Sequence, residues 1–342
     1  MTRTRPGLRR LAAAMLVGAG LFSAGIAPTH AAEIVVKDAT GRDVGVTDTR
    51  RIVSIGGSVT EILYALGLDA RVIAVDTTSI HPPSALQDKP NVGYMRQLSP
   101  EGILAMSPSL VLALDGSGPP EALTVLRAAK VPFVQVPDRF TPTGILDKIR
   151  LVAAAAGEPS RGECLASAVA QELAAVARQP RPASRPLRVL FVLSFVNERA
   201  MVAGRDTAAD GIIRMAGAEN AMADLAGYKP VGDEAIIAAK PDVVLMMERP
   251  GQAFTADAVL SRPAFAMTPA GAGKAFVSMN GQYLLGFGPR TALAVRDLAE
   301  RLAAFGDTAA KPASETPPAS GSPPVADTMA VRHDAALEAC LK

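Results

Sequence analysis

A tyrosine and an arginine stand two residues apart in the stretch "GYMRQLS" at 93–99, and Tyr94 is one of only four tyrosines in the chain. A neighbouring positive charge favours the ionised form of a phenol. A tyrosine phenolate can serve as an axial ligand of haem iron, and Arg96 can hold such an oxygen through a charge-assisted hydrogen bond. A second interpretation is an exposed tyrosine stacked on an arginine, with no ligand. The two residue types alone favour that second interpretation.

A weak internal repeat gives Tyr94 a counterpart. The segments "EGILAMSPSLVL" at 101–112 and "EAIIAAKPDVVL" at 234–245 share six of twelve residues, and a Gly-Tyr pair precedes each of them. Glu101 therefore corresponds to Glu234, and Tyr94 to Tyr228. Ligands of α/β sheets bind beyond the carboxyl ends of the strands. Two lobes of this kind facing each other would place the two tyrosines on opposite walls of a cleft.

Apolar, β-branched runs alternate with helix-favouring segments through most of the chain, which predicts an α/β fold with a mostly parallel sheet. A hairpin at 34–37 and 44–47 precedes this pattern. The first half should contain strands at 51–55, 72–75, 110–114 and 133–136, with helices at 58–66, 100–106 and 120–129. An Ala/Leu-rich stretch at 146–178 predicts a helical connector, broken near 157–159. The same α/β pattern resumes after it.

The segment 1–31 has the form of a secretory signal peptide, with arginines first, then a short apolar stretch and small residues at the end. That apolar stretch is shorter than the roughly 20 residues of a membrane span. We therefore expect a periplasmic protein. The predicted organisation is signal peptide 1–31, N-terminal lobe 32–145, helical connector 146–186, C-terminal lobe 187–306 and low-complexity tail 307–342.

Composition argues against several functions. Without the four arginines of the leader, 31 basic against 33 acidic side chains give a formal charge of −2, which provides no basis for nucleic-acid binding. Beyond the leader the histidines are His81 and His333, too few for a zinc or manganese site or for a hydrolase. Neither a nucleophile elbow nor a Walker loop occurs, so we expect no enzyme. Cys164 and Cys340 can form a disulfide outside the cytoplasm, but the sequence does not show whether they do.

Six stretches together resemble the haem-binding periplasmic proteins of bacterial haem ABC importers. They are "GGSVTEILYALG", "NVGYMRQLSPEGIL", "SPSLVLALDGSGPPEAL", "AGRDTAADGIIRMAG", "GYKP" and "GFGPR", and the resemblance covers residues 33–305. It implies two Rossmann-like lobes joined by a helical backbone, with haem b as the transported ligand. The family's axial tyrosine corresponds to Tyr94 and its supporting arginine to Arg96. Tyr228 and Lys229 would lie on the opposing wall, against the porphyrin or a propionate.

The resemblance also implies a partner. Glu101 and Glu234 match the paired glutamates that dock related binding proteins on an inner-membrane permease, so we expect a monomer that delivers haem to an ABC permease with its ATPase. Arg290 in "GFGPR" is interpreted as structural. Relatives that stack two haems use a histidine in the loop after the first strand of the second lobe, which corresponds to residues 194–197. Residues 194–197 read "SFVN" here, so we expect one haem. A cobalamin or ferric-siderophore binder on the same scaffold is the alternative.

Overall fold

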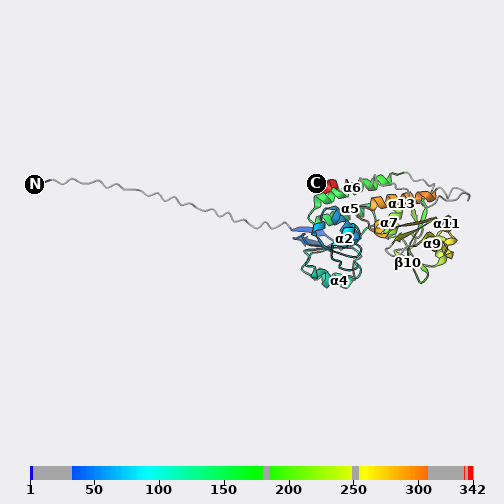
Figure 1. Ribbon diagram of the computed structural model, residues 1–342, viewed down its shortest axis with the longest axis horizontal. Coiled ribbons are helices and arrows are strands. Elements are labelled where there is room, and N and C mark those ends of the chain that lie inside the picture. The colour runs from blue at the N-terminus through cyan, green and yellow to red at the C-terminus, as the bar shows by residue number, and fades with distance from the viewer. Residues whose placement is uncertain (3–32, 180–184, 249–253, 307–334, 336–337, 342) are drawn as a thin grey trace. The chain divides into compact units, whose positions relative to one another are not determined.

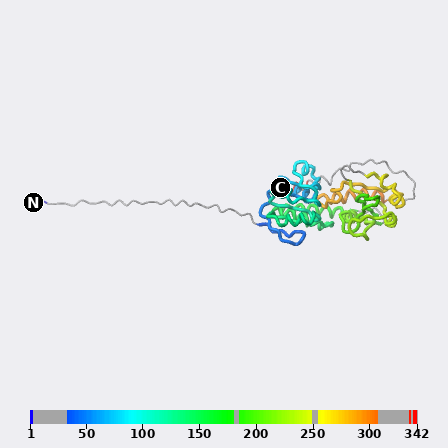
Figure 2. The backbone as a smooth tube through the Cα atoms, turned by 90° about the horizontal axis from the view of Figure 1, so that it is seen from below, coloured from blue at the N-terminus to red at the C-terminus, as the bar shows by residue number. Residues whose placement is uncertain are grey.

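The computed structural model describes residues 1–2, 33–179, 185–248, 254–306, 335 and 338–341. The chain divides into two units, Met1–Ala32 and Glu33–Lys342. Nearly all of the predicted signal peptide and of the predicted tail lies outside the described residues. The backbone of the second unit is traced in Figures 1 and 2.

A hairpin and a parallel four-stranded sheet form the N-terminal lobe. The hairpin is β1 (Ile34–Lys37) with β2 (Asp43–Val46), and the sheet has the order β4-β3-β5-β6. Its strands are β3 (Ile52–Ile55), β4 (Val72–Val75), β5 (Leu110–Leu114) and β6 (Phe133–Val136). β3, β5 and β6 are buried along their whole length, as expected of parallel strands covered by helices on both faces. The predicted hairpin and strands are confirmed.

Helices connect these strands and cover them. They are α1 (Gly57–Ala65), α2 (Pro83–Asp88), α3 (Pro100–Ala105) and α4 (Pro120–Ala128), with a short 3₁₀ helix at Asp69–Arg71. α2, α3 and α4 each begin with a proline in the first turn, where the missing N–H costs nothing. The α/β fold class is thus confirmed for this half of the chain.

The second sheet corrects one expectation. Within the described residues it has six strands in the order β10-β8-β7-β11-β12, with β9 beside β7. They are β7 (Arg188–Val196), β8 (Arg199–Ala203), β9 (Glu219–Asn220), β10 (Tyr228–Val231), β11 (Val243–Glu248) and β12 (Phe276–Asn280). β7, β11 and β12 are parallel, but β8 runs antiparallel to both β7 and β10, so this sheet is mixed.

The stretch 194–197 was expected to be a loop, and that was wrong. Phe195 and Val196 belong to β7, and the hairpin turns at Asn197 and Glu198, which have φ of 48° and 61°. Two consecutive left-handed residues match the turn type that joins tightly paired strands, and asparagine tolerates this conformation. The polypeptide therefore returns along the sheet instead of presenting a loop at its edge. The lobe is completed by α7 (Ala208–Met215), α8 (Asp233–Ala239), α9 (Ala256–Leu260), α10 (Pro263–Ala266), α11 (Pro269–Ala272), α12 (Gly281–Leu285) and α13 (Thr291–Gly306).

Two long helices, α5 (Pro142–Ala155) and α6 (Pro159–Ala177), form the connector. Gly157, with φ of 80°, ends the first helix, and Pro159 begins the second. Gly162 lets the pair pack closely, because a Cβ there would lie 2.2 Å from that of Ala153. α6 also packs along α13, the last long helix of the second lobe (Figure 1). The connector is therefore part of the core and not a free linker.

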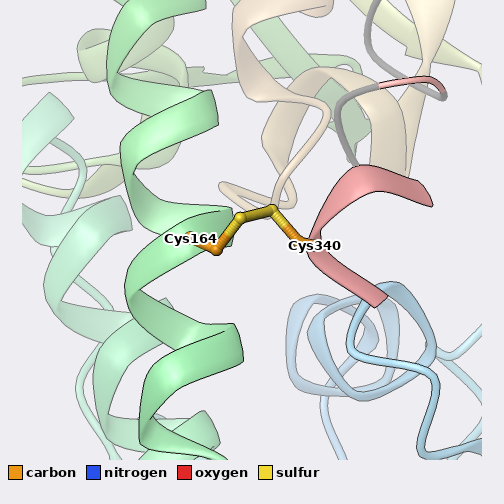
Figure 3. The surroundings of a disulfide bond; sticks show 2 residues. All are labelled: Cys164 and Cys340. Atoms are coloured by element: carbon orange, nitrogen blue, oxygen red, sulfur yellow. A yellow bond between two sulfur atoms is a disulfide. The ribbon is translucent and has the colours of Figure 1, made fainter. Parts of the chain in front are cut away.

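The C-terminal end of the described chain returns to the N-terminal lobe. A disulfide joins Cys164 of α6 to Cys340, which lies in the helical segment 338–341 (Figure 3). Leu341 lies beside α1, since a Cβ at Gly67 would come 2.9 Å from its Cδ2. The bond spans 176 residues of sequence and ties the end of the chain to the connector.

We predict that this disulfide stabilises the protein by closing a long loop in the unfolded chain. Removing it should lower the free energy of unfolding by about 2–4 kcal/mol. Urea denaturation of the oxidised wild type, the reduced wild type and the Cys164→Ser/Cys340→Ser double variant measures this. The double variant should have the same free energy of unfolding as the reduced wild type, and reductant should not change it. Superimposable curves for all three samples would contradict the prediction.

Candidate functional site

The loop that carries Tyr94 is held from both sides. Gly93 has φ of 96° and donates its N–H to Oδ1 of Asn91 at 2.8 Å, which fixes the turn into the loop. Met95 and Leu98 are buried in the core of the N-terminal lobe. Because these neighbours are anchored, Tyr94 projects outward from a loop of defined conformation.

Tyr94 and Arg96 form the pair that their spacing predicted. Nη1 of Arg96 donates to the phenol oxygen of Tyr94 at 2.6 Å, and the guanidinium carbon lies 5.9 Å from the ring centroid. The side chain of Tyr94 is 38% exposed, which is unusual for a large aromatic residue. The phenol oxygen thus faces accessible space with a cation hydrogen-bonded to it.

Tyr228 occupies the equivalent position of the second lobe. It begins β10 directly after Gly227, whose φ is 70°, just as Tyr94 follows Gly93. Burial raises the pKa of the Tyr228 phenol, while hydrogen bonds with Ala209 and Thr207 and the charge of Arg96 partly oppose this. Arg96 therefore lies close enough to act on Tyr228 as well as to hydrogen-bond Tyr94. The side chain of Tyr228 is nevertheless 37% exposed, almost the same fraction as that of Tyr94.

Lys229 is the next residue of β10. It is exposed, like Tyr228, and pairs with Val202 across the β10–β8 ladder. Successive side chains of a strand leave on opposite faces. Lys229 and Tyr228 therefore point away from each other, and the strand does not bring Lys229 to the tyrosine–arginine pair.

A cleft of about 510 Å³ is lined by residues of both lobes. Its volume lies within the range of roughly 300–1,000 Å³ that small-molecule sites have. The apolar lining comes from both walls. Arg96 lines the cleft and donates a hydrogen bond to Tyr94, but neither Tyr94 nor Tyr228 is among the lining residues. The apolar and sulfur-containing side chains are Ile80, Met95, Leu114, Met247 and Leu285.

Several residues of this cleft were not identified from the sequence. Asp115 follows β5, Asp138 lies two residues beyond β6, Glu248 ends β11 and Asn280 ends β12. Each lies at or just beyond the carboxyl end of a strand, where ligands of α/β sheets bind. The available signal was a polar residue at the end of an apolar run. The predicted strands at 110–114 and 133–136, for example, could have located Asp115 and Asp138.

A buried lysine joins the connector to both lobes. Lys148 of α5 is 0% exposed, and its Nζ lies 2.5 Å from Oδ1 of Asp138, 3.3 Å from Oγ of Ser58 and 3.2 Å from the carbonyl oxygen of Phe287. These partners come from the N-terminal lobe and from the second lobe. Burying an ammonium group costs several kcal/mol unless it is paired and hydrogen-bonded, so its partners are needed to keep the charge inside.

A second polar contact joins the lobes beside the cleft. Nη2 of Arg290 lies 2.9 Å from Oε2 of the buried Glu61 on α1, and the backbone N–H of Arg290 donates to the other carboxylate oxygen at 3.0 Å. Arg290 thus has the structural role expected of it, although Nε of its guanidinium has no partner within the described residues. The Arg290–Glu61 contact and the contacts of Lys148 together fix the spacing of the two walls of the cleft.

The two glutamates of the repeat are exposed and lie at equivalent places. Glu101 is in the first turn of α3 and Glu234 in the first turn of α8. Each helix follows the tyrosine loop of its own lobe. The amino end of a helix favours a carboxylate, so these positions are stable for an acid whether or not it binds a partner.

Comparison with known proteins agrees with this architecture. The model of the periplasmic binding protein family matches residues 52–283, which is more than half of the chain. The chain belongs to the periplasmic binding protein family. This family consists of extracytoplasmic binding proteins of transporters, and no enzyme class is associated with it. Within the described residues, no helix is long and apolar enough to span a membrane.

Two solved structures are particularly similar to this binding protein. The periplasmic heme-binding protein BhuT, in complex with two hemes, is 40% identical and has a TM-score of 0.71, with 75% of this chain and 98% of BhuT covered. The apo form of the periplasmic heme-binding protein RhuT from Roseiflexus sp. RS-1 is 41% identical with a TM-score of 0.70, and 77% of this chain and all of RhuT are covered. The resemblance and the two-lobe fold inferred from the sequence are confirmed.

A more distant relative binds a different ligand. The vitamin B12-binding protein of Pectobacterium carotovorum subsp. carotovorum (strain PC1) is 24% identical over 265 residues, which is 77% of this chain and 92% of that protein. The scaffold is therefore shared by proteins with different ligands. The ligand of this binding protein has to be argued from the cleft itself.

We predict that the buried lysine is destabilising as soon as its carboxylate partner is removed. Asp138→Ala should lower the free energy of unfolding by about 3–5 kcal/mol, because it strands a charge that has no access to water. Lys148→Met should cost less, since the side chain of Asp138 is 20% exposed and can be hydrated. Chemical denaturation of both single variants and of the double variant measures the difference. Equal losses in the two single variants would contradict this asymmetry.

Proposed function

We propose that this protein binds haem in the cleft between its lobes, with the phenolate of Tyr94 as the axial ligand of ferric iron. The observation that carries the proposal is the 2.6 Å hydrogen bond from Arg96 to the phenol oxygen of Tyr94, at a cleft lined by both lobes. The likeness to two periplasmic heme-binding proteins, at 40% and 41% identity, supports the same ligand.

The chemistry of the site suits this ligand. A metal ion favours the ionised form of a coordinating group, and Arg96 adds a second positive charge beside the same oxygen. A phenolate is a hard anionic donor and prefers ferric to ferrous iron. Apolar side chains such as Leu114 and Leu285 can cover the porphyrin faces, while reduction of the iron or protonation of Tyr94 would release the cargo.

We propose a stoichiometry of one haem. BhuT has been solved with two hemes, so the fold accommodates a pair. In this chain, however, the stretch 194–197 contains no histidine and continues strand β7 into a hairpin. The wall opposite Tyr94 therefore lacks the histidine that would hold a second iron.

A cobalamin or ferric-siderophore ligand is the second candidate, because vitamin B12-binding proteins share this scaffold. Neither of these ligands requires a phenolate held by an arginine. Titrating the protein with hemin and then with cyanocobalamin, and following the absorption spectrum, separates these ligands. We expect a tyrosinate-type spectrum with hemin, saturating at one equivalent, and no change with cyanocobalamin.

Tyr94→Phe should abolish the tyrosinate-type spectrum. Residues that merely hold a metal ligand in place contribute about 10–100-fold to affinity, so loss of the ligand itself should weaken hemin binding by at least that factor. Hemin titration followed by absorption spectroscopy measures both effects.

Tyr228→Phe is the matched control, since it removes the same hydroxyl from the equivalent position of the other lobe. It should keep the spectrum and most of the affinity. If Tyr94→Phe binds hemin with an unchanged spectrum, or if Tyr228→Phe is the variant that loses it, the assignment of the ligand fails.

The transport partner follows from the same proposal. We infer that the protein is exported to the periplasm through a cleaved signal peptide at 1–31, acts as a monomer, and delivers haem to an inner-membrane ABC permease with its ATPase. Glu101 and Glu234 are proposed to meet basic side chains of the permease. Both are exposed, and each begins a helix at the equivalent position of its lobe.

Charge reversal at these glutamates should weaken uptake without affecting hemin affinity, because complementary charges at an interface govern encounter and register. The Glu101→Arg/Glu234→Arg variant should grow poorly with hemin as sole iron source, at normal protein level. Glu121→Arg serves as control, since Glu121 is also exposed in a first helical turn of the N-terminal lobe. Normal growth of the double variant would remove the docking role.

A further inference from the structure

One amide side chain at the cleft has neither of its polar atoms satisfied. Gln282, on α12, has both Nε2 and Oε1 buried without a hydrogen-bond partner in the described part of the chain. Buried polar groups in folded proteins nearly always have partners, so an amide with two unpaired atoms requires an explanation. Its Nε2 lies against the first turn of α1, within 2.4 Å of where a Cβ on Gly57 would stand.

Gln282 stands between two cavities. It lines the haem cleft and also a smaller side pocket of about 320 Å³, and Ile80 and Asn280 are shared by both. The side pocket is lined by Ile80, His81, Asn280, Gln282, Tyr283 and Arg290. A rotation of the Gln282 side chain would turn its amide toward either space. The two cavities are therefore adjoining, with an unsatisfied amide at their boundary.

The distribution of charge distinguishes the two spaces. The described lining of the cleft contains the carboxylates of Asp115, Asp138 and Glu248, of which Asp138 is paired with Lys148, and its cation, Arg96, already holds Tyr94. The side pocket is lined by no carboxylate among the described residues and contains Arg290.

A second unsatisfied donor lines the same pocket. Nη2 of Arg290 is paired with Glu61, but Nε of the same guanidinium is buried and has no partner within the described residues. The side pocket is therefore lined by two residues, Gln282 and Arg290, that each have a buried N–H group left to donate. A carboxylate could accept from both.

We propose that this side pocket is a carboxylate-binding subsite that takes a propionate of the bound haem, with Gln282 as the residue that recognises it. This rests on the proposed haem function. The amide N–H of Gln282 donates to the carboxylate, and the unpaired Nε–H of Arg290 is a second donor beside it. Gln282 thus orients the porphyrin in the cleft while Tyr94 holds the iron.

The test compares hemin with its dimethyl ester, which keeps the iron and the porphyrin ring but has no free carboxylate. A hydrogen bond to a charged group is expected to favour hemin over the ester by roughly tenfold in Kd for the wild type. Gln282→Leu should reduce this preference by about the same factor, mainly by weakening hemin. Gln282→Glu should weaken hemin further, through repulsion, while changing the ester little. Each complex should keep the tyrosinate-type spectrum.

Gln171→Leu is the matched control, because Gln171 is exposed on α6 and lines neither cavity. It should retain the preference of the wild type. An unchanged preference in Gln282→Leu, or an equal loss in Gln171→Leu, would overturn the subsite and leave the haem function intact. A wild type that does not bind hemin would overturn both. Binding of the ester by the Gln282 variants shows that they are folded.

Discussion

The cleft exists because two lobes are held at a fixed distance from each other. The buried ammonium group of Lys148 contributes strongly to holding them there. Nζ of Lys148 is reached by the carboxylate of Asp138, the hydroxyl of Ser58 and the carbonyl of Phe287, which come from both sides of the joint. Moving one lobe away would remove a partner from a charge that water does not reach. A group of this kind penalises any change of spacing, whereas purely apolar contacts would tolerate sliding. The contact between Glu61 and Arg290 imposes the same constraint through a second ion pair.

A rigid joint suits a site assembled from two walls. Arg96 belongs to the N-terminal lobe, yet its charge affects both Tyr94 and Tyr228. The two phenols start from equivalent positions of the repeat but differ in environment. Tyr94 accepts a hydrogen bond from the guanidinium of Arg96, whereas the phenol of Tyr228 has hydrogen bonds with Ala209 and Thr207 and burial raises its pKa. The two side chains are similarly exposed, at 38% and 37%, so the approximate repeat produces two tyrosines that differ in their polar partners.

The same repeat explains why the family supports several ligands. The sheets, the connector and the exposed glutamates at the first turns of α3 and α8 belong to the framework. The ligand is selected by a few side chains at the carboxyl ends of the strands and in the loops beyond them. Vitamin B12-binding and heme-binding relatives can therefore share the fold. In this chain we propose that the tyrosine–arginine loop selects the ligand.

The sequence alone determined what depends on neighbouring residues. The strands at Val72–Val75, Leu110–Leu114 and Phe133–Val136 were predicted with their observed bounds, because apolar runs ended by turn residues permit little else. The pairing of Tyr94 with Arg96 was also predictable, since two residues in one short loop cannot move far apart. Tertiary structure decided the pairing of Cys164 with Cys340, the mixed C-terminal sheet, the burial of Lys148 and the unsatisfied amide of Gln282. In each case the partners or the surroundings come from distant segments, and no local pattern of residue types records which distant groups will surround a side chain once the lobes have packed.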